Sequence, residues 1–179
     1  MVEEFMRTPL FFLAIPAFAL LACKRGGPPV ISESYPSKNG LITAHYPADF
    51  AASTVGTSSI VLSRKLPGDL DEAVVLVPIE KPVSSDLREF ARVVGAGAEK
   101  QFPGYLESSS VPASCAGKPG IETTGTWKSD PGTPMYLRKA CYFMDSGHGY
   151  SITYLVPASR AADEEPTLRA IREATQFNR

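Results

Sequence analysis

The chain of 179 residues lacks most of the patterns that indicate catalysis or cofactor binding. Its two histidines, His45 and His148, lie far apart in the sequence, and no short ligand spacing points to zinc. Neither a Gly-x-Ser-x-Gly elbow nor a phosphate-binding loop occurs. The residues alone therefore predict a protein without catalytic residues, metal or cofactor.

The sequence also lacks an excess of charge and a long apolar run. Its 18 basic and 19 acidic residues give a net charge of −1, and no basic patch of the kind that binds nucleic acid is visible. The apolar stretch from Pro9 to Leu21 has about a dozen residues, whereas a membrane-spanning helix needs about 20. Its length is that of a signal-peptide core, so a cleaved signal is the better interpretation.

The apolar stretch ends in the residues Leu-Leu-Ala-Cys at positions 20–23, which resemble the lipobox of bacterial lipoproteins. The resemblance implies a signal peptide over residues 1–22, cleavage between Ala22 and Cys23, and a diacylglycerol on the Cys23 sulfur. The acidic start is unusual for a signal peptide, so we predict Met6 as the true initiator. An ordinary signal peptide or an uncleaved anchor is the alternative.

Residues 23–37 are polar and contain the run Gly-Gly-Pro-Pro, which predicts a flexible tether between the lipid and a single globular domain of residues 38–179. Lys24 and Arg25 would lie beside the lipid headgroups. By resemblance to lipoproteins of Gram-negative bacteria, Lys24 in place of Asp predicts the outer membrane, facing the periplasm or the cell surface, rather than the inner membrane. The expected partners are the bilayer and an envelope protein.

With Cys23 assigned to the lipid, two cysteines are left, Cys115 and Cys141. An even number of cysteines in a protein outside the cytosol favours a disulfide bond between them. Two buried free thiols are the alternative, because free cysteine is among the most buried residue types.

Hydrophobic periodicity predicts seven strands and two helices in the order β-β-β-α-β-β-β-β-α. The run Val74 to Val77 is apolar at every position, which predicts a central strand covered on both faces. The strands are expected at about 41–46, 59–64, 73–79, 105–111, 120–128, 135–144 and 150–156, and the helices from Ser85 or Asp86 to Phe102 and from about Ala162 to Phe177.

This order of elements resembles the PsbP-like family, which shares its fold with the Mog and DcrB proteins. The resemblance covers about Tyr35 to Phe177. It implies an α+β fold in which an antiparallel sheet of six to seven strands has helices on both faces, and it implies binding or assembly roles without a shared catalytic residue. The matching segments are Gly40 to Ile42, Tyr46 to Phe50, Ser85 to Leu87, Gly117 to Gly120, Gly149 to Thr153 and the terminal helix.

Two weak motifs have simpler interpretations. The segment from Gly95 to Lys100 begins like a dinucleotide loop, but it lies inside a predicted helix, where small residues allow close packing on a sheet. Asp69, Asp71 and Glu72 lack the remaining ligands of a calcium loop, so a solvated turn is expected there.

Two functional hypotheses follow. The first is a non-enzymatic, lipid-anchored module of the cell envelope that binds a protein or envelope component. The second is an envelope enzyme or small-ligand carrier whose site combines scattered residues, His45, His148 and acids among them, in one pocket with perturbed pKa values.

Overall fold

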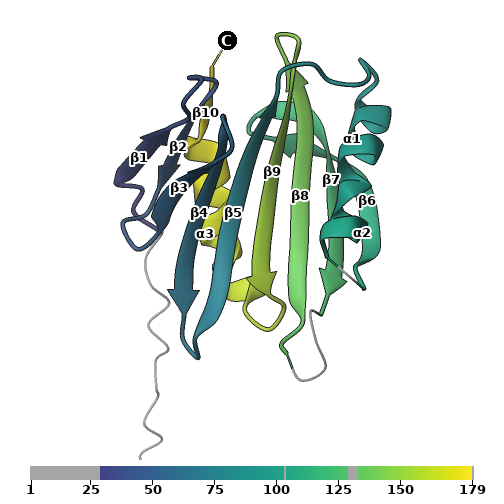
Figure 1. The fold of residues 1–179 in the computed structure, drawn as a ribbon. Coiled ribbons are helices and arrows are strands. Elements are labelled where there is room, and N and C mark those ends of the chain that lie inside the picture. Colours follow the sequence, from purple (N-terminus) through teal and green to yellow (C-terminus); the bar gives the residue numbers. More distant parts are fainter. Residues whose placement is uncertain (1–28, 103, 129–132, 179) are drawn as a thin grey trace, which may run out of the picture.

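The computed structural model describes residues 29–102, 104–128 and 133–178, which form two sheets and three helices (Figure 1). None of the helices in this part of the chain is long and apolar enough to cross a bilayer. The strands are β1 (Glu33–Pro36), β2 (Ile42–Tyr46), β3 (Ala51–Val55), β4 (Ser59–Leu66), β5 (Leu70–Ile79), β6 (Leu106–Cys115), β7 (Lys118–Trp127), β8 (Tyr136–Asp145), β9 (His148–Pro157) and β10 (Gln176–Phe177). The helices are α1 (Leu87–Gly95), α2 (Gly97–Gln101) and α3 (Ala161–Ala174).

The larger sheet has seven antiparallel strands in the order β3-β4-β5-β9-β8-β7-β6, and the smaller sheet has the order β1-β2-β10. The turns between β4 and β5, between β6 and β7 and between β8 and β9 each place a non-glycine residue at positive φ, Asp69 at 59°, Ala116 at 49° and Ser146 at 52°. The α+β class and the antiparallel sheet of six to seven strands predicted from the sequence are confirmed, although the strand predicted at 41–46 lies in the small sheet as β2.

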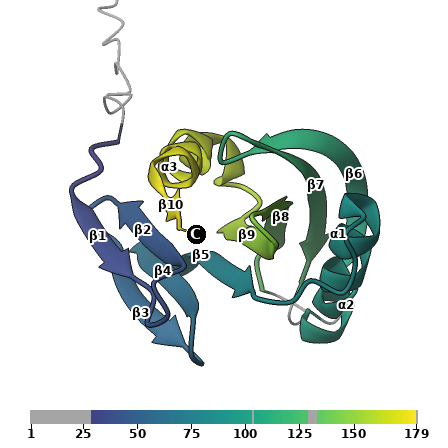
Figure 2. The ribbon, with the colours of Figure 1, turned by 90° about the horizontal axis from the view of Figure 1, so that it is seen from above.

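Alternation along β8 separates the two sides of the large sheet. Cys141 and Phe143 belong to a core on the side of α3 and the small sheet, whereas Ala140 and Tyr142 contact α1 on the opposite side. Figure 2 shows the same division, with α3 and the small sheet on one side and α1 and α2 on the other. Helices on both faces were predicted, and the structure has them.

Helix α1 begins where the sequence indicates. The Asp86 side chain accepts a hydrogen bond from the Glu89 backbone N–H at 2.8 Å, which caps the first turn. The predicted helix up to Phe102 is nevertheless divided, because α1 ends at Gly95 and α2 begins at Gly97. Gly95 lies against the Tyr142 hydroxyl, 3.4 Å from where its Cβ would stand, so the small residue does allow close packing on the sheet.

Three short strands were not predicted, and two of them correct a predicted boundary. Strand β1 pairs with β2 inside the segment expected to be tether, so the ordered domain begins before residue 38. The last helix ends at Ala174 because Phe177 pairs with Ile42 in β10 and packs on Phe143 and Tyr150. The third is β3, which forms the edge of the large sheet next to β4.

Strand β5 is covered on only one face. Val74 and Leu76 are fully buried on the α3 side, but Val75 and Val77 are half-buried on the α1 side. Helix α1 contacts β7 and β8, and Figure 1 shows it at that end of the sheet, away from β4 and β5. The prediction that both faces of this strand are covered is therefore wrong for the α1 side.

Candidate functional site

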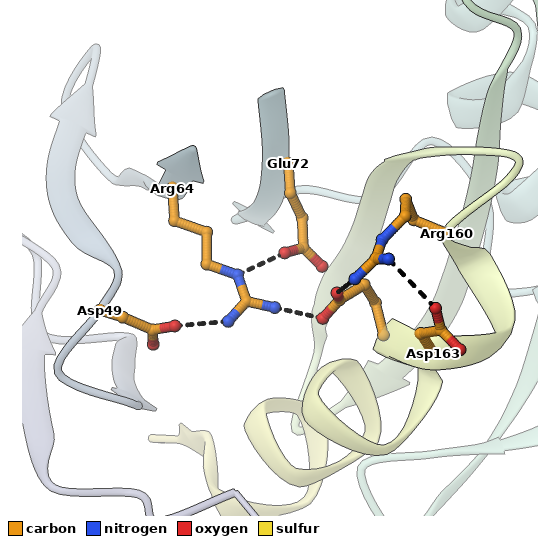
Figure 3. Close-up of polar contacts among 6 residues, drawn as sticks. Asp49, Arg64, Glu72, Arg160 and Asp163 are labelled. Carbon is orange, nitrogen blue, oxygen red and sulfur yellow. Dashed lines mark hydrogen bonds and ion pairs between the residues drawn. The ribbon is translucent and has the colours of Figure 1, made fainter. Parts of the chain in front are cut away.

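Two groups of buried charged side chains stand out among the described residues, and the first surrounds Arg64 (Figure 3). The Arg64 guanidinium donates to Glu72 at 2.6 Å, to Asp49 at 2.5 Å and to Glu164. Strand register places Arg64 directly opposite Glu72, and α3 supplies Glu164. The Arg64 guanidinium also lies 4.5 Å from the centre of the Phe50 ring.

The charge of Arg64 is compensated within this cluster. Each of the three guanidinium nitrogens of Arg64 has a carboxylate acceptor, and Glu164 is shared with Arg160 at 3.4 Å. A hollow of about 400 Å³ lies beside Asp49, Arg64 and Asp163, but the cation there is already paired with three carboxylates. We interpret the cluster as a set of ion pairs that joins β4, β5 and α3 and has a structural role. Glu72, which the sequence placed in a solvated turn, is fully buried within it.

Glu72 gives the cluster a pH dependence. Burial raises the pKa of its carboxyl above the ordinary value of 4.5, and the hydrogen bond from Arg64 only partly offsets this. Because the folded state holds the proton more tightly than the unfolded chain, the Glu72 contribution to the unfolding free energy falls as the pH rises from 4.5 through the raised pKa. Glu72→Gln, which cannot titrate, is therefore expected to gain stability relative to the wild type over that window in urea unfolding between pH 4 and 8.

The matched control is Glu173→Gln, which makes the same change at an exposed glutamate on α3. Its difference from the wild type should stay constant across the same pH range. A constant difference for Glu72→Gln as well would show that burial does not hold the proton on Glu72.

The second group borders a cavity of about 420 Å³ between α1 and the strands β6 and β7. Small and apolar residues form much of its wall, and Tyr105 and Thr123, which carry hydroxyl groups, also line it. Three charged residues line it, Arg88 and Arg92 on α1 and Glu107 on β6, so positive charge exceeds negative charge. The remaining lining residues are Ala91, Gly95, Ala96, Ser110, Pro112 and Ile121.

Arg138 lies behind the two hydroxyls of this wall. It is 5% exposed, and it donates to the Tyr142 hydroxyl at 2.7 Å and to the oxygens of Tyr105 and Thr123, both at 3.5 Å. Its Nε has no acceptor, and none of the ion pairs among the described residues includes it. A buried guanidinium with only neutral hydroxyl partners is costly, since burial removes its hydration without supplying a counter-charge.

Tyr105 is held over this guanidinium by a glycine. The Arg138 guanidinium carbon lies 5.6 Å from the centre of the Tyr105 ring, and a Cβ at Gly125 would overlap that ring. Burial raises the pKa of the Tyr105 hydroxyl above its ordinary value of 10.0, although Arg138 acts in the opposite direction. The hydroxyl therefore stays protonated at neutral pH and can donate a hydrogen bond.

The residues predicted from the sequence do not form this cavity. Ala22 and Cys23 lie outside the described residues, as does the predicted start at Met6. His45 lies on β2 of the small sheet and His148 at the start of β9 in the large sheet, and no polar or ring contact joins them. Neither histidine lines the cavity or the hollow beside Arg64, so the structure gives no support to a site that combines them.

Cys115 and Cys141 lie at disulfide distance, with their Cα atoms 5.8 Å apart and both side chains fully buried. Cys115 is on β6 and Cys141 on β8, so the link crosses β7. It crosses at Gly120, where a Cβ would overlap the Cys115 side chain. This geometry supports the pairing predicted from the cysteine count.

Comparison with solved structures gives a PsbP/Mog1-like fold. The solution structure of cyanobacterial PsbP (CyanoP) from Synechocystis sp. PCC 6803 has a TM-score of 0.56 and 12% identity, over 86% of this chain and 96% of that chain. The Ran-binding protein Mog1p of Saccharomyces cerevisiae has a TM-score of 0.56 and 12% identity, over 83% of this chain and 96% of that chain.

A third similar structure is LpqN of Mycobacterium tuberculosis, described as involved in cell envelope biogenesis. It has a TM-score of 0.54 and 14% identity, over 77% of this chain and 83% of that chain. No protein-family model and no curated protein sequence matches this chain. Identities this low establish a shared fold and no shared site, and the resemblance to PsbP-like and Mog proteins predicted that fold from the sequence.

Proposed function

We propose that this protein is a non-enzymatic binding module held at a membrane of the cell envelope by lipid on Cys23. The observation that carries the binding role is the 420 Å³ cavity with an unpaired buried guanidinium behind its wall. Cavities of about 300–1,000 Å³ with a few polar groups are the common form of small-molecule sites. The likeness to PsbP, Ran-binding and envelope proteins is in keeping with a module that binds rather than catalyses.

The envelope location rests on the sequence and on the cysteine pair. The lipobox-like residues at positions 20–23 directly follow an apolar segment of signal-peptide length. Disulfides persist in oxidising compartments outside the cytosol, and Cys115 and Cys141 are positioned to form one. Lys24 after the cysteine favours the outer membrane.

The cavity favours a small-ligand carrier as a second candidate beside a protein-binding module. It lies between α1 and the large sheet, whereas a protein partner would need an open surface such as the α1 side of β4 and β5. The two roles are separable, because ligand uptake needs the cavity and protein binding does not.

The anchor is tested by comparing the wild type with Cys23→Ala after expression in a Gram-negative host. The wild type is expected in the membrane fraction, with an intact mass that starts at Cys23 and includes lipid. Cys23→Ala is expected to lose the lipid and to leave the membrane fraction in carbonate washes, because one covalent diacylglycerol supplies most of the membrane affinity. Separation of the two membranes on a density gradient checks the predicted outer-membrane location.

Cys115→Ala serves as the control, because it removes a cysteine without touching the lipobox-like residues. It should keep the lipid and the membrane location. An unlipidated wild type, or a Cys23→Ala variant that remains membrane-bound, would contradict the proposed anchor.

A further inference from the structure

We propose that the cavity between α1 and the strands β6 and β7 binds a small organic anion, a carboxylate joined to a short apolar body. This inference rests on the proposed function as a binding module and names the class of its ligand. It rests on the position of Arg138 behind the wall, where it contacts the hydroxyls of the lining residues Tyr105 and Thr123.

Arg138 is a buried cation without a carboxylate partner. It is 5% exposed, and every acceptor it has among the described residues is a neutral hydroxyl. The two bonds from its Nη1 atom are long, at 3.5 Å, which is near the limit for a hydrogen bond. The Arg64 side chain, by contrast, is 12% exposed and has three carboxylate partners. Among the described residues, the more deeply buried of the two arginines is thus the one that has no counter-charge.

The hydroxyl protons of Tyr105 and Thr123 point away from Arg138. Because Arg138 donates to the oxygens of Tyr105 and Thr123, the lone pairs on that side are occupied and the hydroxyl hydrogens are free to point elsewhere. Both residues line the cavity, so their hydrogens can be offered to an acceptor inside it. Arg138 polarises both hydroxyls, and such charge-supported donors suit a carboxylate oxygen.

The rest of the wall combines apolar surface with charged residues. Ala91, Pro112 and Ile121 present apolar surface, which suits a short aliphatic or aromatic body. The exposed Arg88 and Arg92 stand at the rim and raise the local concentration of anions, although Arg92 also pairs with Glu89 at 2.7 Å. Glu107 is the one acid of the wall, and it opposes this attraction at the rim.

The test uses the mature protein purified in detergent and isothermal titration with three probes: hexanoate, its neutral isostere hexanamide and inorganic phosphate. We expect hexanoate to bind at least about tenfold more tightly than hexanamide, since a hydrogen bond to an ionised acceptor is roughly twice as strong as one between neutral groups. Arg138→Met should abolish this preference, and Tyr105→Phe, which keeps the ring over Gly125, should weaken hexanoate binding by about fivefold to tenfold. Tighter binding of phosphate than of hexanoate would overturn the carboxylate class.

The control for charge is Arg169→Met, which removes an exposed arginine on α3 and should leave the affinity for hexanoate unchanged. Thermal unfolding identifies a variant that fails to fold, and Arg138→Met is expected to melt no lower than the wild type, because it removes a charge without a counter-ion. Equal affinity for hexanoate and hexanamide, or a preference that survives Arg138→Met in a folded protein, would overturn the proposal. If the wild type carries no lipid on Cys23 but still binds hexanoate, only the proposed envelope location is refuted.

Discussion

Replacing Phe90 with alanine is expected to lower the free energy of unfolding by about 3–5 kcal/mol, the usual cost of emptying an aromatic site in a packed core. Phe90 is fully buried at the contact between α1 and the large sheet. Its ring lies over Gly149 at the start of β9, where a Cβ would overlap it. Urea unfolding followed by circular dichroism measures the loss. Because α1 forms one wall of the cavity, the same variant should also lose binding of hexanoate.

Val93→Ala is the matched control for this prediction. Val93 lies on the same helix and is 37% exposed, so its truncation should change stability by no more than about 0.5 kcal/mol. Gly149→Ala approaches the same contact from the sheet, since the added methyl meets the Phe90 ring, and overpacking of this kind costs about 1–3 kcal/mol. Losses below 1 kcal/mol for both Phe90→Ala and Gly149→Ala would show that α1 is not docked where the structure places it.

The sequence predicted those elements whose pattern is local. The strand predicted at 150–156 is one of these, and the structure has it as β9, in which Tyr150, Ile152, Tyr154 and Val156 are buried at alternate positions. Helix α1 was equally accessible, because its cap at Asp86 and its apolar stripe both lie within one segment.

Elements that depend on distant partners were missed or misplaced. Strand β1 is largely exposed, and it becomes a strand only because β2 pairs with it. Phe177 continues the helical spacing of Leu168, Ile171 and Ala174, so the pattern extended the last helix too far. Packing on two aromatic rings of the large sheet outweighs that local preference and draws Phe177 into β10.

The burial of Arg64 and Arg138 could have been predicted from the alternation of their strands. Arg64 follows Ile60 and Leu62 at the alternate positions that face the core, and Arg138 precedes Ala140 and Tyr142 in the same way. A charge at such a position indicates a buried ionic group. The alternation cannot say which groups surround it, because Glu164 is 100 residues from Arg64 and the cavity beside Arg138 requires α1 to be in place.

Replacing Cys115 and Cys141 together with alanine is expected to lower the free energy of unfolding by about 3 kcal/mol. The two residues are 26 apart, and the chain-entropy model gives a stabilisation of about that size for closing such a loop in the unfolded state. Reduction of the wild type before urea unfolding should shift the midpoint in the same direction. Cys23→Ala, which leaves the pair intact, should keep the wild-type midpoint.

The structural reason for a large effect is that this link holds an edge of the sheet. Strand β6 has only β7 as a neighbour, and the link from Cys115 to Cys141 connects it to β8 past Gly120, where a methyl group would stand 2.7 Å from the carbonyl oxygen of Tyr142. Strand β6 also supplies one wall of the proposed anion site. If the cavity depends on this bond, the protein has to fold in a compartment where thiols are oxidised. A urea-unfolding midpoint that is insensitive to reductant would therefore remove one of the two arguments for export.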